Sequence, residues 1–276
     1  IPSAAPAVIN ASGAAKISKL QINNLLGVNL NGNLDIINAL DLQNGLLNIA
    51  ASNYIRLVAG QSPVLQGGSA ASYVNGKLRW QSFITSDPLP FPVGKAGKFR
   101  KIEILPNQNS FDFSVEYEAE LIAAPPPART LPGAFTNVNQ QWYHTVSMIA
   151  GSSFFTNATA TIYYEANDGV SNAAALRIGK DDGAGNWLDI GGVGSGTGSG
   201  SITSNSFNSF SDFVLANLSG TVPVALLNFN GNYVNSNVQL NWRVENEINF
   251  ARYQVERSTD GINFTAIGTV AAGGSS

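Results

Sequence analysis

The hydrophobic pattern of residues 17–67 is a series of short apolar pairs at close spacing, with Asn, Gly or Ala between them. Strands this short, with turns this frequent, suit the rungs of a β-solenoid, in which each rung buries its inward side chains against the next. An antiparallel meander fits the same pattern. A solenoid here would be two or three rungs long and would need a cap or a partner, because an open rung exposes unpaired backbone. The pairs are Leu20/Ile22, Val28/Leu30, Leu34/Ile36, Leu40/Leu42, Leu47/Ile49 and Ile55/Leu57.

Residues 68–222 carry longer and more regular alternating segments, such as "FDFSVEYEAEL" and "ATATIYYEA", with turn signals such as "NDG" and "DDGAGN" between them. This pattern is typical of one antiparallel β-sandwich. "APPPARTLPG" is expected to be a proline-rich crossing loop within it, and "GGVGSGTGSGS" a flexible Gly/Ser loop.

From residue 223 the alternation continues, with Asp260-Gly261 predicting a hairpin turn between two strands. About four strands fit before the last residue, whereas a fibronectin-type sandwich needs roughly seven. The sequence therefore predicts an all-β chain with three parts: a solenoid-like stub or meander over 1–67, an antiparallel sandwich over 68–222 and an incomplete fibronectin-like module over 223–276.

Composition narrows the function classes. The chain is 44% hydrophobic and 12% charged, with a net charge of −3 and no Lys/Arg cluster, so it is predicted to be globular and to bind no nucleic acid. No segment approaches the roughly 20 apolar residues of a membrane span, so membrane insertion is not expected. The absence of cysteine excludes a disulfide scaffold, and the start "IPSAAP" without Met suggests that an upstream segment is removed or not included.

Several segments, in order, resemble the C-terminal parts of large secreted surface proteins of Bacteroidetes-type bacteria. They are "LDLQNGLLNI", "GGSAASYVNGKLRW", "FPVGKAGKFRKIEI", "LRIGKDDGAGNWLDIGG" and "LNWRVENEINFARYQVERSTDGINFTAIG". The resemblance implies a β-helical region, a sandwich and a fibronectin-like module. In that family a short sorting domain read by the type IX secretion system follows, and no such domain is present in these residues. Secretion to the bacterial cell surface is thus an expectation from the resemblance.

The partial last module has two interpretations. One is that it begins a domain whose remainder is cleaved, disordered or left out. The other is that a neighbouring molecule completes it by strand addition, because main-chain hydrogen bonds across an open sheet edge supply affinity. A head-to-tail contact of this kind builds filaments when the rotation does not close.

Three groups of side chains are candidates for chemistry. Asp181, Asp182 and Asn186 in "KDDGAGN" offer oxygen ligands around a bend, so they are a candidate calcium site, with a plain hairpin as the alternative. His144 is the only histidine and is expected to be structural, since no nucleophile or orienting carboxylate is evident beside it. Glu116, Glu118 and Glu120 share one face of a strand, which is expected to be a solvated outer face.

Aromatic side chains are the remaining candidate. They would form a sugar-stacking platform if several faced solvent, and core anchors if they faced inward. The candidates are Trp80, Trp142 and Trp187, with Tyr163 and Tyr164.

No acid, base or metal constellation emerges, so the chain is not expected to be an enzyme or to need a cofactor beyond the candidate calcium. The sequence predicts a secreted, cell-surface structural or adhesive protein that self-associates, as a filament subunit, or binds neighbouring surface proteins. One alternative is a carbohydrate-binding accessory region of a larger secreted enzyme, with a glycan as partner. A passive spacer is another.

Overall fold

The computed structural model describes residues 5–59, 63–83, 87–108, 114–218, 225–245 and 252–271. Over these ranges the regular structure is β-strand, apart from three 3₁₀ turns, so the expected all-β class is confirmed. The chain divides into two compact units, Ile1–Leu218 and Ser219–Ser276.

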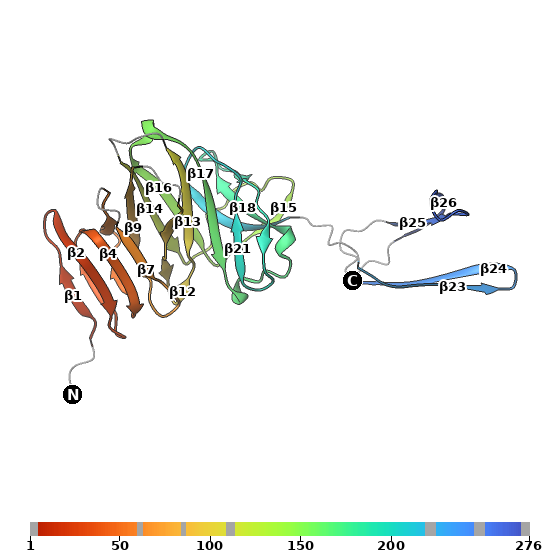
Figure 1. Ribbon diagram of the computed structural model, residues 1–276, viewed down its shortest axis with the longest axis horizontal. Helices are drawn as coiled ribbons and strands as arrows, with labels where there is room; N and C mark the ends of the chain where they lie inside the picture. The colour runs from red at the N-terminus through yellow and green to blue at the C-terminus, as the bar shows by residue number, and fades with distance from the viewer. Residues whose placement is uncertain are drawn as a thin grey trace. The chain divides into compact units, whose positions relative to one another are not determined.

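The first unit begins with a β-solenoid of about three turns (Figure 1). Its strands pair in parallel, in two sheets that run β1-β3-β5-β8 and β2-β4-β6-β9, with β7 also beside β4. Hydrogen-bonded asparagines in the first two rungs are 21 residues apart, which is the length of one turn. A meander would have antiparallel pairs, so the parallel pairing of these strands shows that this part of the chain is a solenoid. The strands are β1 (Ala7–Asn10), β2 (Ala15–Asn23), β3 (Val28–Asn31), β4 (Leu34–Asn44), β5 (Leu47–Ile49), β6 (Tyr54–Leu57), β7 (Val64–Gly67), β8 (Val74–Asn75) and β9 (Lys77–Ser82).

Glycine is required where the solenoid turns a corner between rungs. Gly45, between β4 and β5, has φ +78°, and a Cβ added there would collide with the carbonyl oxygen of Asn24 on the rung before. Only glycine therefore lets two successive corners stack this closely.

The sandwich follows without a break in the sheet. β9 pairs in parallel with β6 on one side and antiparallel with β14 on the other. The remaining strands of this unit are β10 (Leu89–Phe91), β11 (Gly94–Lys95), β12 (Lys98–Phe99), β13 (Ile102–Gln108), β14 (Val115–Ile122), β15 (Phe135–Val138), β16 (Tyr143–Ala150), β17 (Phe155–Tyr164), β18 (Leu176–Asp181), β19 (Trp187–Asp189), β20 (Gly194–Ser195), β21 (Gly200–Thr203) and β22 (Asp212–Leu218). The 3₁₀ turns are η1 (Ser152–Phe154), η2 (Ala166–Asp168) and η3 (Ala173–Ala175).

One 11-stranded sheet runs through both parts, in the order β19-β18-β22-β16-β14-β9-β6-β4-β2, with β15 beside β22 and β7 beside β4. A five-stranded sheet, β10-β13-β17-β21-β20, belongs to the sandwich. One cluster of buried side chains extends from Ile22 in the solenoid to Leu215 in the sandwich. The pairing changes from parallel to antiparallel at β9 (Lys77–Ser82), later in the chain than the boundary expected at residue 67, and the core is continuous across it.

The second unit has the four strands expected from the sequence, arranged as two antiparallel hairpins. In the first hairpin, Asn235 and Ser236 form the turn with φ of 48° and 67°. The turn at Asp260-Gly261 is longer than a two-residue hairpin loop, and Asp260 accepts hydrogen bonds there from the backbone amides of Ile262 and Asn263. The strands are β23 (Ala225–Val234), β24 (Asn237–Glu245), β25 (Arg252–Arg257) and β26 (Thr265–Ala271).

Candidate functional site: two open β surfaces

The first rung of the solenoid has a free edge among the described residues. Strand β1 pairs only with β3, and β2 only with β4. The amides of Ala7 and Ala11 donate to Gly27 and Asn31 on the next rung, at 3.2 and 2.7 Å. Because alternate residues of a strand bond to opposite sides, the backbone groups of Val8 and Asn10 point away from the solenoid. They are free to pair with a further strand.

Asparagine side chains form stacks along the solenoid, and the stacks have a direction. In each pair the Nδ2 of the later rung donates to the Oδ1 of the earlier rung. The first-rung residues Asn10 and Asn23 therefore accept within the solenoid, and their own Nδ2 groups have no partner among the described residues. The pairs are Asn31 to Asn10 (3.0 Å), Asn44 to Asn23 (3.1 Å), Asn48 to Asn29 (3.0 Å) and Asn75 to Asn48 (2.9 Å).

Side-chain burial shows what a covering rung contributes. Ile17 and Leu20 of the first rung pack against the core but are only partly buried, whereas their register partners on the second rung, Ile36 and Leu40, are completely buried. Leu25, at the corner after β2, is 84% exposed. Among the described residues, the outer edge of the first rung thus carries exposed apolar surface as well as unpaired backbone groups, a combination that favours strand addition.

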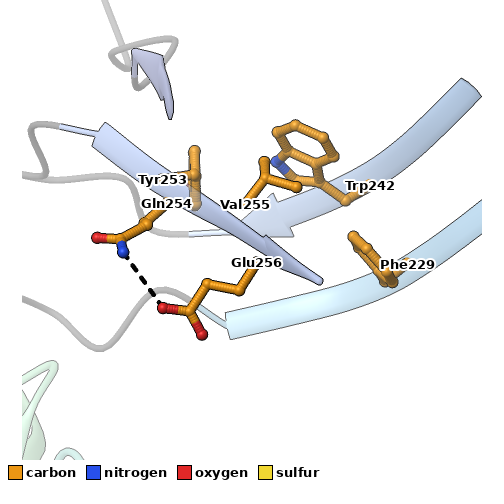
Figure 2. A pocket seen from close by; sticks show the side chains of 6 residues that line it. All are labelled: Phe229, Trp242, Tyr253, Gln254, Val255 and Glu256. Carbon is orange, nitrogen blue, oxygen red and sulfur yellow. Dashed lines mark hydrogen bonds between the residues drawn. The ribbon is translucent and has the colours of Figure 1, made fainter. Parts of the chain in front are cut away.

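The second open surface lies on the hairpins of the second unit (Figure 2). Val238, Leu240 and Trp242 alternate along β24 with polar residues, so they share one face of the strand. Phe229 lies opposite Trp242 on β23, with ring centroids 6.4 Å apart.

Tyr253 on β25 makes an aromatic contact between the two hairpins. Its ring meets that of Trp242 edge to face, with centroids 5.8 Å apart. Phe229, Trp242, Tyr253 and Val255 border a cleft of about 200 Å³, which Figure 2 shows from close by. Phe229 is still 55% exposed and Val238 64% exposed. The apolar face of each hairpin is therefore only partly covered by the other.

The carboxylates of β14 are not on a freely solvated face, and that expectation is corrected. Arg79 on β9 donates to Glu118 at 2.6 Å and to Glu116 at 3.1 Å, and Arg56 on β6 donates to Glu116 at 3.0 Å. Lys95 pairs with Glu120 at 2.8 Å. These side chains form a cross-strand ladder of ion pairs over the join between solenoid and sandwich, so each carboxylate is neutralised by a cation from a neighbouring strand.

His144 lies in the core, on β16. Its Nε2 is 2.8 Å from the carbonyl oxygen of Arg100 and donates to it, while Nδ1 is buried without a hydrogen-bond partner. Burial lowers the pKa of His144 to about 4. Arg100 and Asp168 form a buried ion pair nearby, at 2.6 Å, and Asp168 also accepts from Trp142 Nε1 at 2.7 Å. This network holds η2 against the start of β13 and has a structural role.

The three tryptophan candidates are core residues. Trp80, Trp142 and Trp187 are 7%, 0% and 2% exposed, and Tyr164 is also buried. Trp80 Nε1 donates to the carbonyl oxygen of Pro90 and Trp142 Nε1 to Asp168, both at 2.7 Å. A stacking platform needs open ring faces, so these rings do not provide one.

The candidate calcium ligands lie together in the turn between β18 and β19, with every carboxylate oxygen already accepting a hydrogen bond from the protein. Asp181 accepts from Arg129 and from the Gly183 amide, both at 2.9 Å. Asp182 accepts from Asn186 through backbone and side chain, at 3.0 and 2.7 Å, and from the Ala184 amide. These bonds lower the pKa of both aspartates. A calcium ion would have to replace them, and calcium binding stays a prediction.

Within the described ranges, no three His, Asp or Glu side chains gather as a metal site. No helix there has the length and apolar character needed to span a membrane. No family model, curated protein or solved structure matches the chain.

Proposed function

We propose that this chain is a secreted structural and adhesive protein of the bacterial cell surface and the subunit of an extracellular filament. Neighbouring copies join head to tail by β-strand addition. The observation that supports this most directly is the open first rung, in which free backbone, unpaired asparagine amides and partly covered aliphatic side chains lie on the same edge. Secretion and surface location rest on the resemblance of the motifs to secreted Bacteroidetes surface proteins.

The hairpins of the second unit match this edge in architecture. The open rung consists of two strands from two facing sheets, and the second unit consists of two hairpins with facing aromatic side chains. β2 has 9 residues, as has β24, and β1 has 4 residues against 6 in β25. In a neighbouring copy, one hairpin can therefore pair with β1 and the other with β2, so that each sheet of the solenoid gains strands. The aromatic side chains of the hairpins would then continue the core of the solenoid.

Energetics favour such a contact. An isolated two-stranded hairpin is marginally stable in water, because it buries too little apolar surface to offset its conformational entropy. Docking on the solenoid would cover Phe229 and Val238, which are more than half exposed. Burying a side chain of this size from full exposure contributes roughly 1.5–3 kcal/mol, and covering the exposed part of each of these two contributes a little over half of that.

Electron microscopy of the native, unconcentrated protein tests the proposal. We expect filaments with an axial repeat near the length of one chain. Trp242→Ser, which removes the central aromatic residue of the second surface, should abolish them, whereas Gln239→Ser on the polar side of the same strand should not.

Monodisperse single chains in the native material would overturn the assembly, and so would filaments that form equally well with Trp242→Ser. Circular dichroism and thermal unfolding of residues 1–218 within each variant serve as the folding control.

A further inference from the structure

The sequence of β24 repeats the pattern of the first-rung strand β2. Leu20–Asn23 of β2 reads LQIN and Val238–Asn241 of β24 reads VQLN, in both cases an aliphatic residue, Gln, an aliphatic residue and Asn. In a β-strand this order places the two aliphatic side chains on one face and the two amide side chains on the other. β24 therefore presents the same two faces as a strand of the solenoid.

Neighbouring rungs of the solenoid place side chains of the same kind beside each other. Ile22 of β2 lies beside Leu42 of β4, and Asn23 lies beside Asn44. The Nδ2 of Asn44 donates to the Oδ1 of Asn23 at 3.1 Å. A further strand outside β2 continues both columns if it places an aliphatic residue beside Ile22 and an amide oxygen beside Asn23.

β24 has the groups that such a strand needs, and the described residues leave them unused. Among those residues β24 pairs only with β23, so one of its edges is open. Asn241 is exposed and its side chain forms no hydrogen bond there. Its Oδ1 can therefore accept the hydrogen bond that the free Nδ2 of Asn23 is able to donate.

β25 carries a similar pattern, Tyr253–Glu256 or YQVE, but it is a poorer partner for β2. The residue just before the pattern is Lys19 in β2, Asn237 in β24 and Arg252 in β25. Pairing β25 with β2 would set Arg252 beside Lys19, and like charges on directly opposite residues are destabilising. β24 sets an uncharged amide at that position instead.

We propose that β24 of a neighbouring copy joins β2 in parallel and in one register, with Asn237 beside Lys19 and Asn241 beside Asn23. The inference rests on the proposed filament and adds to it the strand, the direction and the register of the joint. The asparagine stack then continues across the joint, from Asn44 through Asn23 to Asn241.

The parallel direction follows the rest of the solenoid, whose strand pairs are all parallel. An antiparallel strand would set Asn237 beside Asn23, and the Nδ2 of Asn237 already donates to the carbonyl oxygen of Asn235. In the parallel register the next residue of β24, Trp242, lies at the corner after β2, where Leu25 is 84% exposed.

Cysteine cross-linking tests the register, since the chain has no cysteine of its own. Full chains with Lys19→Cys are mixed with chains that carry Asn237→Cys, Asn241→Cys or Arg252→Cys, all at exposed positions, and are oxidised mildly. Neighbours on paired strands lie about 4.8 Å apart, within reach of a disulfide. We expect covalent dimers mainly from the mixture with Asn237→Cys, and few from the other two mixtures or from Lys19→Cys alone.

A double-mutant cycle tests the asparagine stack. Asn23→Asp leaves Asn241 able to donate to the new carboxylate, and Asn241→Asp leaves Asn23 able to do the same, so each change alone should be tolerated. Together they set two carboxylates side by side. We expect the critical concentration for assembly to rise at least about tenfold beyond the product of the two single effects. Thermal unfolding of each variant is the folding control.

Equal yields from all three mixtures, or dimers mainly from Asn241→Cys or Arg252→Cys, would overturn the register. Independent effects of the two Asp substitutions would overturn the stack across the joint. Filaments in the microscope without dimers from any mixture would exclude the pairing of β24 with β2 and leave the proposed filament in place. The absence of both filaments and dimers would overturn the proposed function together with this inference.

Discussion

At the residue scale, the closeness of successive rungs depends on glycines whose neighbours leave no room for a Cβ. Gly45→Ala should lower the free energy of unfolding by at least about 2 kcal/mol, because a positive φ and a collision with Asn24 act together. Thermal unfolding measures the loss. Gly13 also has a positive φ, +63°, but has no atom within 4 Å of an added Cβ. Gly13→Ala should lower the free energy of unfolding by only about 1 kcal/mol. Equal decreases for the two variants would contradict the steric argument.

His144 gives the protein a pH-dependent stability. Its pKa is about 4 in the folded protein, against 6.5 for an unperturbed histidine, because burial and the nearby Arg100 cation oppose protonation. The unfolded chain therefore binds the proton more readily, and stability falls as the pH drops from about 6.5 to about 4. The full loss is about 3 kcal/mol.

Chemical unfolding at several pH values, with His144→Gln as reference, isolates this effect from that of the carboxylates. The difference in stability between the two proteins should change by about 3 kcal/mol between pH 7 and pH 4. Parallel pH curves would show that His144 is not protonated on unfolding.

At the element scale, the edge of β1 can be blocked without disturbing its pairing with β3. The backbone N–H of Val8 points away from the solenoid, so Val8→Pro removes a donor only from the free edge. We expect this variant to fold and to form no filaments by electron microscopy, while Val8→Thr keeps the backbone donor and assembles normally. Filaments of normal length from Val8→Pro would exclude β1 as the joining edge.

The elements themselves were predictable from the sequence, but their partners were not. Leu20/Ile22 and Leu40/Leu42 alternate with polar residues in the same way whether the strands pair in parallel or antiparallel, so the pattern could not distinguish solenoid from meander. Period-two spacing placed Glu116 and Glu118 on one face. It could not reveal Arg79, which only the fold brings beside them.

The candidate site shows the same limit. The sequence offers Trp187 and Asp181 as separate candidates, for stacking and for calcium, and in the fold both bond to the same proline-rich loop, Asp181 to Arg129 and the amide of Trp187 to the carbonyl oxygen of Thr130. Arg129 itself gave no signal, because an arginine in a proline-rich loop is ordinary at the surface. Its ion pair with Asp181 becomes evident only in the fold.

At the scale of the whole molecule, the two units differ greatly in how much apolar surface they bury. The first has a continuous core, while the second leaves Phe229 and Val238 more than half exposed. Differential scanning calorimetry of the dilute monomer should therefore show two transitions, with the second unit unfolding at the lower temperature. This transition should shift upward with protein concentration, because assembly stabilises only the folded unit.

Trp242→Ser should remove the lower transition and leave the upper one in place. A single cooperative transition for the whole chain would contradict the independence of the two units.

The change from parallel to antiparallel pairing at β9 also has a consequence for the order in which the strands fold. β9 is flanked by β6 on one side and by β14, which begins at Val115, on the other. If the sandwich is the template on which the rungs stack, the rung nearest to it closes first and the rung containing Ala7–Asn10 closes last. Over these residues folding then runs opposite to synthesis, because β1 is made before β4 and β14 but becomes ordered after both. We expect hydrogen-exchange protection during refolding to appear in β14 before β4, and in β4 before β1.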